Sequence, residues 1–489
     1  MIAKHTRFRP SIAAVVALFV IQSALAQQVS PTPPSFVLIL ADDLGWTSLS
    51  VAMDERHPDA RSQYHETPHL ADLAARGMRF PNAYAASPVC SPTRYSILLG
   101  QTPARLGKTI VRGPNRIDHA QPGLPDVLKS IDERYVCAHL GKWHVDADPE
   151  TFGYDLSDGK TGNKEGGYGA NRPNQRNKEW GGYPSDDPKL TPSITARAVD
   201  FLDDRAARGE PFFLQVSYYA VHSDIVYSDG AFDRAQARPP GPVHSNAGYA
   251  AMVADLDRGV GELIAALDRL GLDERTYVFF VSDNGGVPSI PPKTSRGNPH
   301  APGLNTPLRR GKWDLTEGGI RVPFIVRGPG VEPGTQCNSL VSTIDLMPTL
   351  SDLAGRVSAV PRTADGGSFM PQLKDPTLRT VDRPLGDALV FHFPHWNMLG
   401  LGEPHSAVRQ GRFKLLRFHV SERSLLFDLE TDIAEECDLS GTHPETAFAL
   451  ESLLSGYLAG VTAESPRDSF SKKIGEDGHA TTRFLDNTD

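Results

Sequence analysis

The chain has 489 residues, of which 39% are hydrophobic and 22% charged, and its formal net charge is −9. This composition is typical of a globular protein, and the acidic balance argues against a nucleic-acid partner, which would favour a basic surface. The length exceeds the size at which single hydrophobic cores stop growing, so we expect one large domain and one smaller one.

The N-terminus has the pattern of an export signal. Basic residues within 4–9 precede an apolar run over Ile12–Leu25, and Ala24-Leu25-Ala26 supplies a small-x-small cleavage pattern. The apolar run is too short for a comfortable membrane span, and no later segment is long enough to be one. We therefore expect a signal peptide over 1–26, a periplasmic or secreted protein, and no membrane insertion after cleavage.

Four apolar runs have the character of strands buried on both faces of a mostly parallel sheet, because they are near-continuous and rich in β-branched and aromatic residues. They are Ser35–Leu40, Tyr135–Leu140, Phe212–Tyr219 and Thr276–Val281. Helical patterns lie between them, over Thr67–Gly77 and Ala250–Leu270. Ligands of open α/β sheets bind beyond the carboxyl ends of the strands, so we expect a site where the polar residues after these runs converge.

The rest of the chain indicates scaffold, loops and a second domain. Val322–Val326 is interpreted as a scaffold strand, and residues 158–189, rich in Gly, Asn and Tyr, as a long surface loop. A change of composition near 366–376 indicates a boundary, followed by short antiparallel strands within 407–429 and a covering helix near 445–458. We expect a catalytic domain over 35–375, a C-terminal α+β subdomain over 376–465 and a polar tail over 466–489.

Acidic and amide side chains follow two of the four runs. Asp42 and Asp43 come after the first run, and Asp283 and Asn284 come after the fourth. Oxygen ligands suit Ca²⁺ or Mg²⁺, and no His or Cys set with zinc spacing accompanies them. Buried adjacent carboxylates repel one another, so a cation is needed to keep both ionised. The alternative for either pair is a helix cap or a turn, where Asp and Asn-Gly are common.

Cys90-Ser91-Pro92-Thr93-Arg94 opens a further apolar helical run. Taken alone, Cys90 could be a free cysteine at a helix start, where the backbone N–H groups would lower the pKa of its thiol. The Cys-x-Pro-x-Arg pattern, however, resembles the signature of the type I sulfatases. Further blocks resemble that family in the same order, namely Gly141–His144, Ser282–Gly286, Pro307–Lys312 and Glu317–Pro323.

The resemblance implies the fold of the alkaline phosphatase superfamily. This is an α/β fold with a large mixed, mostly parallel sheet flanked by helices, here with a smaller C-terminal domain of antiparallel sheet and helix. It also implies a sulfuric ester hydrolase in which a maturation enzyme oxidises Cys90 to formylglycine, whose hydrate attacks sulfur. The implied ligands of Ca²⁺, with Mg²⁺ as the lesser alternative, are Asp42, Asp43, Asp283, Asn284 and modified Cys90.

The resemblance also implies catalytic roles. Arg94 and the metal polarise the hydrated aldehyde, and Lys142 and Lys312 neutralise the sulfate oxygens. His222, with Lys312, protonates the departing alcohol, and His144 deprotonates the remaining hydroxyl so that sulfate is expelled. Taken alone, the lysines could be solvated surface residues and the histidines core residues. Their expected arrival at one sheet edge favours the functional interpretation.

The substrate is less sharply indicated. Export and long polar, aromatic loops favour a sulfated carbohydrate, with a small sulfate ester as the simpler possibility. Candidates for a substrate rim are His392, His395, Trp396 and Arg409, with His405 beside them, although the same stretch could instead dock two domains. A phosphodiester or phosphonate monoester hydrolase of the same superfamily would keep the site and change the ester. A non-catalytic glycan-binding protein would have lost an essential residue, and none is lost here.

The cysteine content does not indicate a disulfide framework. The four cysteines are Cys90, Cys137, Cys337 and Cys437, which is too sparse a set for one. If Cys90 is converted, three remain, so at most one bridge can form.

Overall fold

The computed structural model of the chain describes residues 32–112, 116–169, 182–288, 304–397 and 401–466. The chain divides into two units, Met1–Pro33 and Pro34–Asp489, and every element described below belongs to the second. The expected signal peptide and nearly all of the expected polar tail lie outside the described residues.

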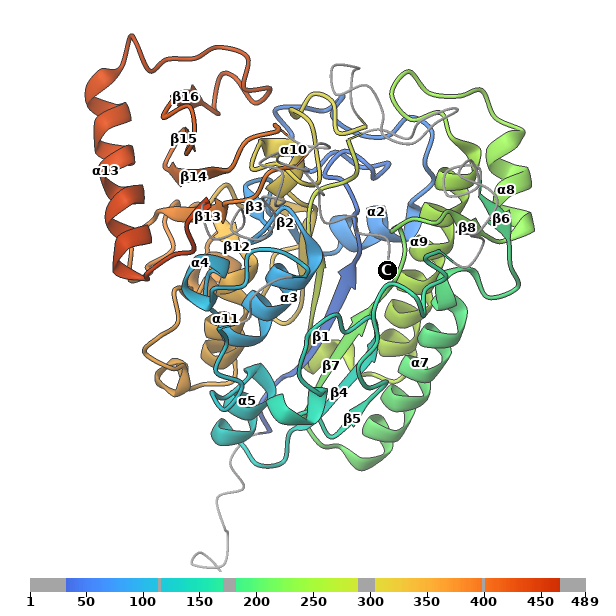
Figure 1. The fold of residues 1–489 in the computed structure, drawn as a ribbon. Helices are drawn as coiled ribbons and strands as arrows, with labels where there is room; N and C mark the ends of the chain where they lie inside the picture. Colours follow the sequence, from blue (N-terminus) through green and yellow to red (C-terminus); the bar gives the residue numbers. More distant parts are fainter. Residues whose placement is uncertain (1–31, 113–115, 170–181, 289–303, 398–400, 467–489) are drawn as a thin grey trace, which may run out of the picture. The chain divides into compact units, whose positions relative to one another are not determined.

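A large mixed sheet organises the described part of the chain (Figure 1). Its central strands are β1 (Ser35–Ala41), β4 (Val136–Gly141), β7 (Phe212–Ser217) and β9 (Thr276–Ser282). Its outer strands are β2 (Met78–Arg79), β5 (Leu156–Ser157), β10 (Phe324–Arg327) and β11 (Thr335–Gln336). The strand order is β11-β2-β10-β9-β1-β7-β4-β5. Every pair is parallel except those of β10 with β9 and with β2, so the expected mostly parallel mixed sheet is confirmed.

Helices cover both faces of this sheet. One layer contains α2 (Pro68–Ala75), α7 (Thr191–Arg208), α8 (Asp229–Gln236) and α9 (Ala247–Arg269). The other contains α3 (Cys90–Leu99), α4 (Pro103–Leu106), α5 (Leu124–Ile131), α11 (Leu346–Leu353) and α12 (Met370–Lys374). The helices expected over Thr67–Gly77 and Ala250–Leu270 are therefore present as α2 and α9.

Strand β1 shows why the apolar runs do not alternate between apolar and polar residues. Val37 and Ile39 pack into the core beneath α7 and α9, whereas Leu38 and Leu40 pack into the core beneath α3 and α5. All four side chains are buried. Burying an aliphatic side chain of this size stabilises the fold by about 1.5–3 kcal/mol relative to exposure, so both faces of the strand favour apolar residues.

Short elements connect these layers. The short strand pairs are β3 (Ala83–Tyr84) with β12 (Val341–Ser342), and β6 (Tyr183–Pro184) with β8 (Val226–Tyr227). A single α-helical turn, α10 (Glu317–Ile320), precedes β10. The 3₁₀ turns are η1 (Pro149–Phe152), η2 (Pro188–Leu190), η3 (Asp273–Arg275), η4 (Thr343–Asp345) and η5 (Val357–Ala359). Among the described residues, no helix is long and apolar enough to cross a membrane.

The C-terminal part forms a second, antiparallel sheet. Its strands, in order, are β13 (Leu389–Phe393), β14 (His405–Gln410), β15 (Phe413–Phe418) and β16 (Ser424–Asp428). One face packs against helix α13 (Pro444–Gly460), and the other packs against residues near Tyr84 and Val89. The sequence did not predict β13, because its apolar run is short and is interrupted by His392.

Candidate active site

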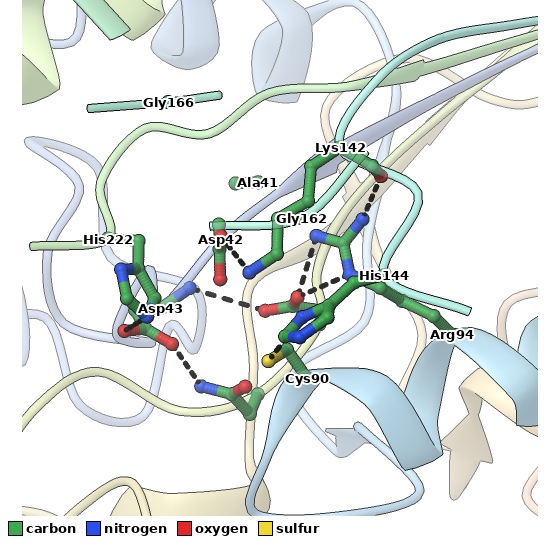
Figure 2. A network of polar contacts seen from close by, with 12 residues as sticks. Ala41, Asp42, Asp43, Cys90, Arg94, Lys142, His144, Gly162, Gly166 and His222 are labelled. Carbon is green, nitrogen blue, oxygen red and sulfur yellow. Dashed lines mark hydrogen bonds and ion pairs between the residues drawn. The ribbon is translucent and has the colours of Figure 1, made fainter. Parts of the chain in front are cut away.

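The carboxyl ends of β9, β1, β7 and β4 lie side by side, because these strands are neighbours and run parallel. Asp283 and Asn284 follow β9, and Asp42 and Asp43 follow β1. His222 follows β7, and Lys142 and His144 follow β4. Cys90 begins α3, and its side chain faces the same cluster (Figure 2). Four strand ends, one helix start and the loop that carries Lys312 therefore build the site.

A group of oxygen atoms in this cluster fits a metal ion. The carboxylates of Asp42 and Asp283 and the Sγ of Cys90 place ligand atoms within 4.8 Å of one another. Asp42 Oδ1 and Asn284 Oδ1 are buried and have no hydrogen-bond partner among the described residues. A buried oxygen without a partner is costly, and an oxygen-coordinated cation would satisfy both atoms. The donor set therefore suits Ca²⁺ or Mg²⁺.

Three cations pair with the three carboxylates of the cluster. Lys142 Nζ lies 2.5 Å from Asp42 Oδ2, and Lys312 Nζ lies 2.7 Å from Asp43 Oδ1. Arg94 donates from Nε and Nη2 to Asp283 Oδ2, at 2.9 and 2.8 Å. The charges of these three pairs cancel, so a bound divalent cation would make the site positive and attract a monoanionic sulfate ester.

The pKa values follow from these pairs. Burial opposes ionisation of Asp42, but the charges of Lys142 and other nearby cations lower its pKa well below the usual value. Burial likewise opposes the charge of Lys312, but Asp43 raises its pKa above the usual range. Burial and the charge of Asp42 raise the pKa of Asp283, which Arg94 only partly offsets. A cation bound beside Asp283 would favour the ionised form of this carboxylate.

Cys90 is held as a thiol rather than a thiolate. Its side chain is buried, and its Sγ lies 3.2 Å from Nδ1 of His144. Burial raises the pKa of the thiol, and the charges of Lys142 and Lys312 do not overcome that effect. The lowered pKa that a cysteine at a helix start would have is therefore not found, because desolvation outweighs the helix terminus.

The two histidines differ in their surroundings. Nδ1 of His222 donates to the Ser223 carbonyl at 2.6 Å, which leaves Nε2 to face Asp43 Oδ2 at 3.8 Å. Burial and the charge of Lys312 lower the pKa of His222 to about 3. Burial and Lys142 also lower the pKa of His144 well below its usual value. Both imidazoles are therefore neutral in the absence of added negative charge.

The backbone holds the lysine-bearing segments tightly. Gly141 ends β4 with a φ of +96°, and a Cβ there would lie 2.1 Å from the Ser217 carbonyl oxygen, so only glycine fits. Asn305 is fully buried and donates from Nδ2 to Gly286 and Arg310 carbonyls, at 3.0 and 2.8 Å. It thereby connects the segment after Asn284 with the segment that carries Lys312. Sequence reasoning missed Asn305, since a lone asparagine in a loop has no periodic signal.

The expected rim residues lie mainly in contacts with other parts of the protein. His392 is buried in β13, with ring nitrogens 2.7 Å from Ser406 Oγ and 2.8 Å from the Glu464 carbonyl oxygen. His395 is also buried, with Nε2 2.8 Å from Thr109 Oγ1.

The two other expected rim residues differ in exposure. Arg409 is buried over the Tyr84 ring and donates to Asn82 Oδ1 at 3.2 Å. Trp396 is 37% exposed. Beside them, His405 Nε2 accepts from the Leu315 N–H at 3.0 Å. Of the four rim candidates, Trp396 has the greatest access to solvent.

Two further residues near the site were missed within the expected surface loop over 158–189. Lys189 is buried, with 3% of its surface exposed, and the ring of Tyr168 lies 5.3 Å from that of His222. The Gly-rich composition of this segment indicated a long surface loop and gave no sign of which side chains face the site.

An α/β sheet covered by helices on both faces, with carboxylates, paired cations and a Cys-x-Pro-x-Arg motif at its carboxyl edge, defines a hydrolase of the alkaline phosphatase superfamily. Comparison with known proteins makes the assignment specific. A family described as Sulfatase matches residues 34–356, and one described as N-sulphoglucosamine sulphohydrolase, C-terminal, matches residues 311–454. The chain belongs to the sulfatase family, and its reaction is the hydrolysis of sulfuric esters.

Individual relatives agree with this assignment. N-acetylgalactosamine-6-sulfatase of Mus musculus is 31% identical over 385 residues, covering 73% of this chain and 69% of the relative. Arylsulfatase A of Homo sapiens is 31% identical over 484 residues, covering 86% and 87%. Among solved structures, Ps i-CgsB in complex with k-i-k-neocarrahexaose is similar, with a TM-score of 0.70, 25% identity, and coverage of 89% of this chain and 94% of that chain.

Proposed function

We propose that this sulfatase releases sulfate from a sulfated carbohydrate, using formylglycine made from Cys90 together with a bound Ca²⁺. The observation that carries the proposal is the convergence of Asp42, Asp283 and Cys90, with ligand atoms within 4.8 Å of one another, beside two orphaned buried oxygens. A protonated, buried thiol is a poor nucleophile, which favours a converted residue at this position over a cysteine thiolate.

The chain's own residues fit the metal and the modification. Asp42, Asp43, Asp283 and Asn284 would hold Ca²⁺, which when bound supplies a Lewis acid at the reacting oxygen. Formylglycine at position 90 would supply a hydrated aldehyde, and hence an oxygen nucleophile in place of sulfur. Conversion requires a maturation enzyme that recognises the segment from Cys90 to Arg94.

The cations around Cys90 would bind and orient the sulfate group. Arg94, Lys142 and Lys312 are all buried, so their charges act in a medium of low dielectric constant. Each is already held by a carboxylate, and it need not reorganise as charge develops on the sulfate oxygens. The expected contribution of one such group is about 10²–10³ in kcat.

The histidines would move protons on the two sides of the reacting group. Nε2 of His222 faces Asp43, in the direction of Lys312, which supports its assignment to the departing alcohol. Nδ1 of His144 lies against position 90, which supports its assignment as the base that acts there. Binding of an anionic ester adds negative charge beside both rings and favours their protonated forms.

A sugar substrate is supported by the relatives. One is named for N-acetylgalactosamine 6-sulfate chemistry, and the similar solved structure is described as a complex with a carrageenan-type oligosaccharide. The export pattern at the N-terminus supports action in the periplasm or outside the cell, where polymeric substrates are found. The phosphodiester or phosphonate alternative is not favoured by the family assignment, and it remains an outcome of the test below.

The test begins with protein whose conversion at Cys90 has been confirmed by peptide mass. Free sulfate is then measured from a panel of sulfated polysaccharides, oligosaccharides and an aryl sulfate, with Ca²⁺ present and a matched aryl phosphodiester alongside. We expect release from at least one glycan, abolished in Cys90→Ala and retained in Cys437→Ala, which removes an exposed cysteine. A much larger rate on the phosphodiester, or sulfate release by Cys90→Ala, would overturn the proposal.

A further inference from the structure

The segment of residues 158–168 runs along the site from one candidate catalytic histidine to the other. At its start, the Thr161 carbonyl accepts from the His144 N–H at 2.8 Å, and Thr161 Oγ1 accepts from the Trp143 N–H at 2.8 Å. At its end, the ring of Tyr168 meets the ring of His222 edge to face, with centroids 5.3 Å apart and planes at 77°. The segment is therefore part of the site and not a remote surface loop.

Local hydrogen bonds give this segment a defined shape. The Gly162 N–H donates to Glu165 Oε2 at 2.6 Å, and the Gly167 N–H donates to the Lys164 carbonyl at 2.9 Å. The N–H of Tyr168 donates to the Asn163 carbonyl at 3.1 Å. The residues that precede Tyr168 thus form a closed turn, which determines where its ring lies.

Packing beneath the turn restrains it further. A Cβ on Gly166 would lie 2.4 Å from the Tyr219 ring, so the backbone of the turn rests directly on that ring. Lys189 is buried and donates from Nζ to the Gly166 carbonyl at 2.9 Å. Figure 2 shows Gly162 and Gly166 drawn with the cluster of Asp42, Lys142 and His222. A buried lysine and an aromatic ring therefore hold the turn against the site.

We propose that Tyr168 forms a wall of the subsite for the departing alcohol and packs against a sugar ring, with Lys189 as the positioning residue of the turn that carries it. The inference rests on the proposed function, because it takes His222 to face the departing alcohol. A partly exposed aromatic ring touching that histidine must then border the same group. Aromatic rings favour the flat, weakly polar face of a sugar through area burial and CH contacts.

The chemistry distinguishes this role from a purely structural one. A ring that contacts the sugar contributes to its binding, whereas a ring that only orients His222 contributes to proton transfer. Removal of a sugar-contacting ring therefore raises KM, whereas loss of orientation lowers kcat. The phenol oxygen is not required for packing, so Tyr168→Phe keeps the function and Tyr168→Ala loses it.

The experiment uses the full, converted, Ca²⁺-loaded enzyme and the sulfated sugar that the wild type hydrolyses fastest in the panel. We expect Tyr168→Ala to raise KM roughly 2- to 10-fold with little change in kcat, and Tyr168→Phe to match the wild type. Lys189→Met should raise KM in the same direction by a smaller factor. Phe448→Ala, which removes an aromatic ring 75% exposed on α13, is the matched control and should leave both constants unchanged.

A binding measurement separates contact from catalysis. In the Cys90→Ala background, calorimetric titration with the same sugar should give a dissociation constant that Tyr168→Ala weakens by the same factor. A fall in kcat at constant KM, or unchanged binding in the Cys90→Ala background, would overturn the Tyr168 proposal while leaving the sulfatase activity intact. A wild-type enzyme that releases no sulfate from any sugar would instead overturn the proposed function, and the sugar contact with it.

Discussion

Lys142 Nζ lies 2.5 Å from Asp42 Oδ2, and both side chains are completely buried. The pair joins the residue after β4 to the residue after β1, across a sequence separation of 100. Because neither group is solvated, Asp42 depends on the charge of Lys142 to remain ionised. This dependence makes the pair a sensitive probe of both the metal site and the fold.

We predict that Lys142→Met lowers kcat for sulfate release by about 10²–10³, because it removes a preorganised charge beside the sulfate oxygens. It also leaves Asp42 buried without its cation, so the melting temperature should fall. That fall should be smaller in Ca²⁺ than in EDTA, since a bound divalent cation compensates Asp42. The control is Lys129→Met, which removes a partly exposed lysine paired with Asp155. Retention of kcat by Lys142→Met would contradict the assignment.

Metal removal should destabilise the protein. Asp42 Oδ1 and Asn284 Oδ1 lack partners, and mutual repulsion of the carboxylates returns when the cation leaves. At a free Ca²⁺ concentration of 100 times its dissociation constant, linkage predicts a stabilisation of about 2.7 kcal/mol. This stabilisation is measured by thermal unfolding in EDTA and again after Ca²⁺ or Mg²⁺ has been restored. Asn284→Ala should show a weaker response to Ca²⁺, and an equal response in that variant would count against the ligand assignment.

The buried cluster around Glu317 should be critical for stability. Lys414 Nζ on β15 lies 2.8 Å from Glu317 Oε1 and 2.9 Å from Glu435 Oε1, and all three side chains are buried. Lys414→Met removes the cation beside Glu435 and one of the cations beside Glu317, which Arg321 still pairs at 2.6 Å. The loss should cost about 3–5 kcal/mol in the free energy of unfolding. Adding Glu435→Gln should restore part of that loss. Strictly additive effects in denaturant unfolding would show that the groups are not coupled.

Acid should destabilise the contacts of the C-terminal sheet. Burial lowers the pKa of His392 to about 3, and those of His395 and His405 to about 4, from a usual value of 6.5. Between about pH 6.5 and 4 the unfolded chain therefore binds more protons, so stability is complete above this range and falls as the pH decreases through it. Each histidine should cost about 2 kcal/mol at pH 5.

Urea unfolding between pH 7.5 and 5 measures this dependence. As the pH falls, the free energy of unfolding of His395→Gln should decrease less steeply than that of the wild type, whatever the stability of the variant at pH 7.5. A parallel decline in the variant would mean that His395 does not contribute to the acid sensitivity.

Trp396 provides a test of the substrate rim. It is 37% exposed, whereas its neighbour His395 is buried against Thr109. If Trp396 contacts a polymeric substrate, Trp396→Ala should raise KM for the polysaccharide and leave the aryl sulfate unaffected. An unchanged glycan rate would remove Trp396 from the rim and leave this stretch a role in packing alone.

The central strands and their chemistry were accessible from the sequence. A strand buried on both faces needs apolar residues at every position, so β1, β4, β7 and β9 appear as continuous runs. Parallel strands also bring their carboxyl ends together whatever their connections, which is why Asp42 and Asp283 could be expected at one edge. The scaffold strand β10 was likewise expected, although its antiparallel pairing with β9 was not.

Segments without a repeating pattern were not accessible. Residues 158–168 take their place from hydrogen bonds of Thr161 to the backbone around His144, and no periodicity records such contacts. Strand β13 is short and carries His392 in its interior, so it resembled a polar rim. Its strand character comes from pairing with β14, which is a tertiary contact.

By itself the sequence determined which chemical groups the site contains and in what order the chain delivers them: Cys90 with Arg94 one helical turn away, and acids, lysines and histidines after buried strands. Only the tertiary structure decided that Lys142 pairs with Asp42, that Lys312 pairs with Asp43, and that Cys90 stays protonated. The physical reason is that pairing and pKa depend on distances and on exclusion of water. These distances and this exclusion of water arise between residues far apart in the chain, so no local sequence pattern indicates them.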